Sequence, residues 1–172
     1  MSTGVSPIRI LVVGRFQPPH LGHMHLLKQA AELGEVIVVV GSAEKSRVTN
    51  NPFSCRERLE MLKQALVEGG FDLSKFTLTP IEDTHSNELW VARVEMLTPK
   101  FDVVMTGNSQ VGDLFRAKGY RVVNPHQLKP RVYNGSAIRR ASGRKKVWEK
   151  SVPKSVVNFI HTHKLLKVFQ TG

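Results

Sequence analysis

Hydrophobic positions along the chain fall into two alternating kinds of segment. Short, nearly continuous apolar runs, typical of strands buried on both faces, occupy residues 8–14, 35–41, 76–81, 101–108 and 120–125. Segments with apolar residues every three or four positions, typical of amphipathic helices, occupy residues 22–33, 56–68, 88–97, 111–117 and 154–163, and a further helix starts at about Ser136. This alternation predicts an α/β fold with a Rossmann-like, doubly wound parallel sheet of about five strands and helices on both faces.

The length of 172 residues is that of one domain, and no repeat or linker divides it. We expect a single domain over residues 1–172, with a core at about 8–125 and a C-terminal helical part at about 133–165. The longest apolar run, Val36 to Val40, is far shorter than the roughly 20 residues that span a bilayer. Residues 1–9 lack the apolar core of a secretory signal, and Cys55 is the single cysteine. These features predict a cytoplasmic protein without a membrane partner.

The formal net charge of +11 indicates an anionic partner, either nucleic acid or phosphorylated small molecules. Much of the basic excess lies between Arg139 and Lys167, in a segment with little aromatic content. A single-stranded nucleic-acid surface should interleave basic and aromatic residues. A solvated basic tail explains this segment as well, so we expect no nucleic-acid partner, and the charge alone selects no function.

The loop after the first predicted strand concentrates polar residues where parallel sheets bind ligands, beyond the strand's carboxyl end. Its sequence, residues 14–23, is "GRFQPPHLGH". His20 and His23 have a spacing that could bind a metal, but no cysteine or carboxylate pair accompanies them. They could also have a purely structural role at the start of a helix. A third interpretation is a phosphate site, because Gly22 permits close approach, the helix start offers free N–H groups, and Arg15 adds a cation.

A second candidate anion site, "YNGSAIRR", occupies residues 133–140. Ser136 is expected to cap a helix, and Arg139 follows one turn later, so an exposed helix start and a guanidinium would face the same ligand. An ordinary capped surface helix has the same pattern. Two such sites in one small α/β domain are suited to a triphosphate.

The first segment resembles the HxGH signature of the nucleotidyltransferase superfamily, and the second is similar to that superfamily's Ser/Thr-x-x-Arg signature. The resemblance extends to the archaeal-type nicotinamide-nucleotide adenylyltransferases through "GSAEKSRVTNNPFSCRERLEML" and "NELWVARVEMLTP", in the order and spacing of that family. It implies transfer of AMP from ATP to nicotinamide mononucleotide, giving NAD and pyrophosphate. It also implies Mg²⁺ or another divalent cation held mainly by the ATP phosphates, with no dedicated metal ligands, and a homo-oligomer for which a hexamer is one candidate.

The same resemblance assigns roles to individual residues. Phosphate contacts that support catalysis fall to His20, His23, Arg15 and Arg139. The expected ATP-binding residues are Gly14, Phe16, Gly22, Gly107, Ser136 and Ile138. The expected binding residues for the mononucleotide are Asp83, Asn87, Trp90 and Arg47, with Trp90 as a stacking surface for the nicotinamide ring. Because the attacking group is a phosphate, no side-chain base is needed, and the histidines are expected to act as hydrogen-bond donors.

Two features depart from the family pattern or leave it open. Some members carry a basic residue just before "NPF", where this chain has Asn50, and Arg47 is the candidate replacement. Arg58 matches the family block, yet it could equally pair with Glu57 or Glu60 on the same helix. The alternative functions are a sister HxGH enzyme with pantetheine phosphate, flavin mononucleotide or a CTP-using reaction, and a basic nucleic-acid-binding module.

Overall fold

A computed structural model describes residues 7–171, except for the side chains of residues 145 and 146. The predictions about a secretory signal and about the ends of the domain fall in part on residues 1–6 and 172, outside this range. The strands are β1 (Arg9–Gly14), β2 (Glu35–Val40), β3 (Phe76–Pro80), β4 (Val103–Met105) and β5 (Arg121–Val123). The longer helices are α1 (Leu21–Leu33), α2 (Cys55–Glu68), α3 (Asn87–Leu97), α4 (Ser109–Ala117) and α7 (Lys154–Thr162).

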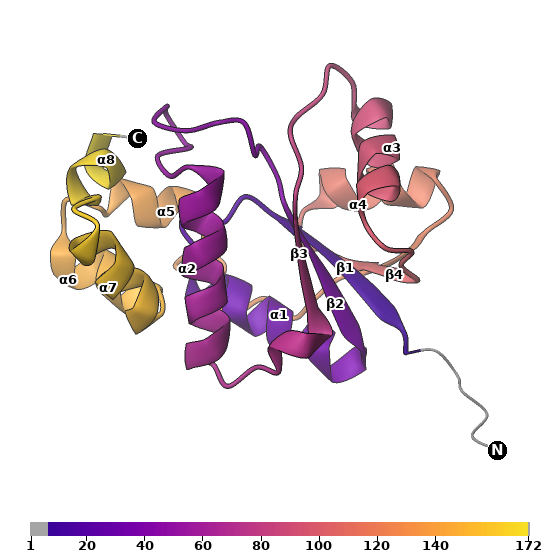
Figure 1. Cartoon of the computed structure of the whole chain (residues 1–172), viewed down its shortest axis with the longest axis horizontal. Helices are drawn as coiled ribbons and strands as arrows, with labels where there is room; N and C mark the ends of the chain where they lie inside the picture. The colour runs from indigo at the N-terminus through magenta and orange to yellow at the C-terminus, as the bar shows by residue number, and fades with distance from the viewer. Residues whose placement is uncertain (1–6, 172) are drawn as a thin grey trace.

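The strands form one parallel sheet in the order β3-β2-β1-β4-β5 (Figure 1). In the register of the sheet, Val12 of β1 lies beside Val38 of β2 and Met105 of β4. The strand order reverses at β1, because the chain builds outward to β2 and β3 on one side and to β4 and β5 on the other. Ligands of such sheets bind beyond the carboxyl ends of the strands at this reversal, which directs attention to the residues after Gly14.

Both faces of the sheet are covered by helices, as the continuous apolar runs predicted. Ile10 and Val12 point toward α1 and α2, where they pack with Leu27 and Leu62. Leu11, between them in the sequence, faces the opposite layer that α3 and α4 form. The doubly wound fold class is therefore confirmed.

The C-terminal segments form a separate hydrophobic cluster against the outer side of α2 (Figure 1). They are α5 (Gly135–Arg140), α6 (Lys145–Trp148), α7 and α8 (Leu166–Thr171), and the short 3₁₀ turns of the chain are η1 (Leu73–Lys75) and η2 (Glu149–Ser151). Trp148 is fully buried at the centre of this cluster, beside Phe169. The sequence did not predict α6 or α8, because helices of four and six residues are too short to show a periodic pattern.

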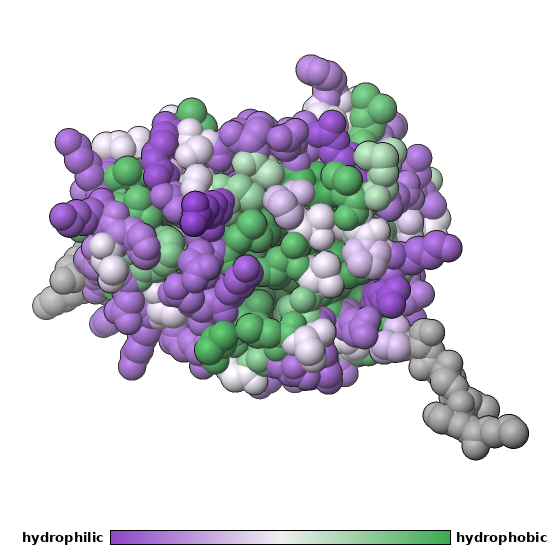
Figure 2. Space-filling model, in the orientation of Figure 1, coloured by the Kyte–Doolittle hydropathy of each residue, from purple (hydrophilic) through white to green (hydrophobic). Residues whose placement is uncertain are grey.

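Polar side chains cover most of the face seen in Figure 2, and apolar ones gather between α2 and α3, where β3 forms the edge of the sheet. Within residues 7–171, no helix is both long enough and apolar enough to cross a bilayer.

Candidate active site

The two histidines of the first motif hold each other in place at the start of α1. His20 is the N-cap, and its Nδ1 accepts a hydrogen bond from the backbone N–H of His23 at 3.3 Å. In return, Nδ1 of His23 accepts from the backbone N–H of His20 at 3.2 Å, and the two rings stack with centroids 3.5 Å apart. This is a capping box in which histidines replace the usual serine and glutamate. It fixes both rings before any ligand binds.

Burial favours the neutral form of both imidazoles. Burial, followed by the charge of Arg139, lowers the pKa of His20 to about 3. Burial and the neighbouring His20 lower the pKa of His23 well below its ordinary value. Since Nδ1 of each ring accepts a backbone N–H, the single proton of each neutral ring must sit on Nε2. Each ring therefore has an Nε2–H that could donate to a ligand, and the role of the histidines as donors rather than bases stays a prediction.

The lowered pKa of His20 predicts acid-sensitive stability. The unfolded chain takes up a proton near pH 6.5 and the folded chain only near pH 3, so this contribution is complete above pH 6.5 and declines as the pH falls. We expect wild-type protein to lose about 2 kcal/mol more free energy of unfolding between pH 7 and pH 5 than His20→Asn, whose side chain can still cap the helix. Urea unfolding at both pH values measures this difference.

The control for this measurement is His85→Asn, which changes an exposed histidine and should follow wild type. Equal losses in wild type and His20→Asn would show that His20 is protonated in the folded protein.

The second motif lies directly against the first. A side chain on Gly22 would bring its Cβ within 2.8 Å of the backbone oxygen of Tyr133, so this close approach requires glycine. The helix cap expected at Ser136 is instead Asn134, whose Oδ1 accepts from the backbone N–H of Ala137 at 2.8 Å. Ser136 consequently lies inside the first turn, where its hydroxyl faces Arg139. The prediction of a serine cap is wrong by two residues, because asparagine competes equally well for that position.

Arg139 joins the second motif to the loop of the first. Its Nη1 donates to the backbone oxygen of Gln17 at 3.1 Å, and its Nη2 donates to Asn50 Oδ1 at 3.1 Å and to Ser136 Oγ at 3.2 Å. The side chain is largely buried, and burial together with the charge of Arg15 lowers its pKa, although a guanidinium stays charged at neutral pH. A held cation beside two N–H donors is suited to phosphate oxygens.

A cavity of about 150 Å³ lies among these groups. Its lining includes Arg15, His20, His23, Ser136 and Arg139. The structure therefore brings all four residues predicted to support catalysis, together with Ser136, to one place, although the two motifs lie more than 100 residues apart in the sequence. We call this space the phosphate cavity.

A second cavity of about 410 Å³ shares His20 and His23 with the phosphate cavity and extends toward the end of β4. Gly22 and Gly107, both predicted to bind ATP, line it, as do His126 and Pro130 of the loop after β5. Phe16 lies in the phosphate cavity, and its ring packs against that of His23 with centroids 4.5 Å apart.

The structure places Gly14 and Ile138 away from this second cavity. Gly14 touches the ring of Phe16, since a Cβ there would lie 2.9 Å from it, and it lines a different cavity. Ile138 is buried in the hydrophobic cluster around Trp148. Its side chain therefore packs in the protein interior.

A third cavity, of about 690 Å³, lies on the other side of Arg15. It extends from the carboxyl ends of β1 and β2 to α3, and Asn87 and Trp90 line it. Asp83 also lines it, with its carboxylate accepting from Ser42 Oγ at 3.0 and 3.1 Å and from the ammonium of Lys45. Burial acts to raise the pKa of Asp83, but the hydrogen bonds from Lys45 and Ser42 outweigh burial and lower it.

Arg47, predicted to bind the mononucleotide, is not among the lining residues of the third cavity. Its guanidinium contacts both carboxylate oxygens of Glu57, at 2.6 and 2.8 Å, and donates to the backbone oxygen of Pro52 at 2.7 Å. The structure therefore gives no support to Arg47 as the substitute for a basic residue at position 50. Asn50, which holds that position, binds Arg139 instead.

Arg58 holds the backbone of residues that line the third cavity, a role that the sequence did not reveal. It is fully buried, and it donates to the backbone oxygens of Arg15, Gly41 and Ser42 at 2.7, 2.8 and 2.9 Å. Of the two possibilities left open, pairing with Glu57 or Glu60 does not occur, because the side chain extends to the carboxyl ends of β1 and β2. Burial lowers the pKa of Arg58. One guanidinium thus fixes the backbone after β1 and the backbone after β2, at the same end of the third cavity.

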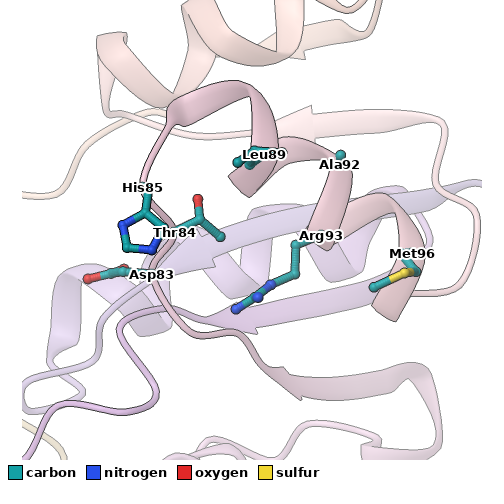
Figure 3. A pocket seen from close by; sticks show the side chains of 7 residues that line it. All are labelled: Asp83, Thr84, His85, Leu89, Ala92, Arg93 and Met96. Carbon is teal, nitrogen blue, oxygen red and sulfur yellow. The ribbon is translucent and has the colours of Figure 1, made fainter.

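A further cavity, of about 520 Å³, runs along the outside of α3 (Figure 3). Leu89 and Met96 give it an apolar wall, and it meets the third cavity at Asp83 and Thr84. No sequence motif predicted this surface.

Metal ligands were not predicted, and among the residues that the structure describes no group of three or more His, Cys, Asp or Glu side chains could hold a metal ion. In His20 and in His23, Nδ1 accepts a hydrogen bond from the backbone N–H of the other histidine. Only Nε2 of each ring is therefore left to face a ligand.

The fold and the site define a class of protein. Residues 11–163 match the family model described as cytidylyltransferase-like. Two curated relatives are named nicotinamide-nucleotide adenylyltransferase. The one from Pyrococcus horikoshii is 46% identical over 154 residues, which cover 89% of this chain and 82% of the relative. The one from Thermococcus sibiricus is 44% identical over 154 residues, which cover 89% of this chain and 83% of the relative. The chain belongs, within the cytidylyltransferase-like class, to the nicotinamide-nucleotide adenylyltransferase family.

Solved structures share the fold at low sequence identity. The bifunctional NMN adenylyltransferase/ADP ribose pyrophosphatase from Francisella tularensis aligns with a TM-score of 0.79 and 18% identity over 96% of this chain. This chain spans 52% of that larger protein. A putative nicotinate-nucleotide adenylyltransferase from Vibrio parahaemolyticus aligns with a TM-score of 0.64 over 93% of this chain and 96% of its own. The family and the fold expected from the sequence are thus confirmed.

Proposed function

We propose that this chain transfers AMP from ATP to nicotinamide mononucleotide, forming NAD and pyrophosphate. The observation that carries the proposal is that three cavities share lining residues around the phosphate cavity, and the cavities at the end of β4 and at Trp90 also share Val13 and Asn108. The cavity at the end of β4 shares His20 and His23 with the phosphate cavity, and the phosphate cavity shares Arg15 with the cavity at Trp90. ATP would occupy the first two spaces and the mononucleotide the third, so that their phosphates meet at Arg15.

The reaction needs position and charge more than it needs acid or base groups. A phosphate oxygen of the mononucleotide attacks the α-phosphorus of ATP and forms a new P–O bond. The bond from the α-phosphorus to the bridging oxygen of the β-phosphate breaks in line, and pyrophosphate leaves with that electron pair. The attacking phosphate is largely dianionic at neutral pH, so no side chain has to remove a proton.

The chain's own groups are suited to this charge distribution. The Nε2–H donors of His20 and His23 would bind oxygens of the ATP phosphates. Arg139 would bind the departing pyrophosphate through the N–H groups that are not donated to Gln17, Asn50 and Ser136. Arg15 would neutralise the two reacting phosphates. Donors fixed before binding need no rearrangement in the transition state.

Mg²⁺ or another divalent cation would accompany ATP. It would be held mainly by the phosphate oxygens, because the described residues supply no cluster of acidic ligands near them. When bound, it supplies further positive charge to the phosphates.

Trp90 and Asn87 make the acceptor proposal specific. The Trp90 side chain is half-buried, packs edge-on against Phe115 with centroids 6.1 Å apart, and borders the third cavity. An indole face there would stack on a pyridine ring, and the amide of Asn87 would hydrogen-bond a carboxamide.

The test is product formation with purified protein, ATP, Mg²⁺ and one acceptor at a time. We expect NAD from nicotinamide mononucleotide, identified by chromatography and by its reduction with a dehydrogenase. Product from phosphopantetheine or flavin mononucleotide instead, or from CTP in place of ATP, would overturn the proposal in favour of a sister enzyme. Protein lacking Arg139, as Arg139→Ala, is the control for contaminating activity.

A further inference from the structure

The third cavity would have to neutralise the charge of an acceptor phosphate. Two of the nearby cations are already engaged by other residues. Arg47 is engaged by Glu57, and Arg139 is held by Gln17, Asn50 and Ser136 on the far side of Arg15. Position 50 itself is a neutral asparagine. Of these three arginines, Arg15 is then the one left to face the acceptor phosphate, which carries about −1.5 to −2 charges at neutral pH.

Lys45 is the second cation of this cavity. It follows β2 by five residues, lines the same space as Arg15, Asn87 and Trp90, and is half exposed. Its ammonium is held by Asp83, and this contact raises the pKa of Lys45 above its ordinary value, so the side chain is charged at neutral pH. The sequence analysis assigned it no role.

The contact with Asp83 fixes where the Lys45 ammonium lies. Asp83 is itself held by the hydroxyl of Ser42, which lies within hydrogen-bond distance of both carboxylate oxygens. The backbone oxygen of Ser42 accepts from the buried Arg58. The ammonium is therefore held over the carboxyl ends of β1 and β2, the end of the cavity that Arg15 also borders, while Trp90 borders it from α3. An ammonium has three N–H donors, and Asp83 occupies one side of it, which leaves donors for a second anion.

We propose that Lys45 binds the phosphate of the acceptor mononucleotide. This inference rests on the proposed function. The phosphate would lie between Lys45 and Arg15, with the nicotinamide ring toward Trp90. The Lys45–Asp83 pair holds the ammonium in position before the acceptor arrives, so the phosphate adds a partner to a cation whose side chain is already ordered.

The test compares two ligands that differ only in the phosphate group, nicotinamide mononucleotide and nicotinamide riboside, by isothermal titration calorimetry. We expect Lys45→Ala to weaken binding of the mononucleotide by about tenfold, since a hydrogen bond between two charged groups is lost. Binding of the riboside should change by less than about twofold. Lys45→Arg, which keeps the charge, should recover most of the loss, and Lys63→Ala, which removes an exposed lysine on α2, should bind like wild type.

Steady-state kinetics gives a second measurement. Lys45→Ala should raise the KM for the mononucleotide by a similar factor and leave the KM for ATP unchanged. Equal weakening of mononucleotide and riboside, or no weakening of either, would overturn the assignment and leave Lys45 as a surface partner of Asp83. Wild-type protein that binds neither ligand and forms no NAD would instead overturn the proposed function itself, and with it this inference.

Discussion

Replacing His23 by asparagine should lower kcat for NAD formation by about two orders of magnitude or more, while the fold stays intact. Asn Oδ1 lies near the position of the imidazole Nδ1, so it can still accept the backbone N–H of His20 that closes the capping box. What the variant loses is the Nε2–H donor in the phosphate cavity. A donor that stabilises the charge developing at the phosphates affects kcat more than the KM of either substrate.

Two further variants separate the roles of the two ring nitrogens. His23→Ala removes both and should show the same loss of kcat together with a lower free energy of unfolding. His23→Gln places an N–H donor near the position of Nε2 and should retain more activity than asparagine. A kcat for His23→Asn equal to that of wild type would return His23 to a purely structural role at the helix start. Steady-state assays and urea unfolding measure the two effects separately.

Replacing Arg58 by methionine should reduce the free energy of unfolding by about 3 kcal/mol and also reduce activity. Methionine has a similar length and fills the space, but it leaves the backbone oxygens of Arg15, Gly41 and Ser42 buried without their donor. A buried oxygen without a partner costs on the order of 1–3 kcal/mol, partly relieved when the loops move or admit water. Such movement would displace Arg15 and Ser42 and so disturb both reacting phosphates.

Arg56→Met is the matched control, because Arg56 is an exposed residue on the same helix. Its free energy of unfolding should stay within about 0.5 kcal/mol of wild type in urea unfolding followed by circular dichroism. Arg58→Lys should fall between the two, since an ammonium keeps the charge but cannot contact three oxygens in the geometry of a guanidinium. A loss below about 1 kcal/mol for Arg58→Met would show that the three oxygens find other partners.

The fold could be predicted because its strands are buried on both faces and its longer helices are amphipathic. Both properties can be recognised from short stretches of the sequence, as in β2 and α1. The short helices α6 and α8 could not be predicted, because their positions depend on contacts with Trp148 and Phe169 rather than on any period of their own. The homo-oligomer and the cytoplasmic location stay predictions.

The sequence predicted the part of the candidate site that the two motifs form. His20, His23, Arg15 and Arg139 converge because the two motifs follow β1 and begin α5, at one edge of the sheet. Nothing in the local sequence distinguishes Arg58, which is buried, from Arg56, which is exposed, since both belong to the same helix. The neutral state of the histidines likewise depends on burial and on mutual capping, which only the assembled structure defines.

The C-terminal helices complete a site whose other residues follow the strands of the sheet. The whole sheet ends at Val123, yet Arg139 reaches Gln17 only when α5 is seated beside α2 together with Trp148 and α7. All five strands therefore lie N-terminal to the residue that completes the phosphate cavity. A chain shortened after β5 would contain the residues of all five strands but lack the guanidinium that we propose for pyrophosphate binding. The proposed phosphate binding thus depends on a part of the chain that contributes no strand to the sheet.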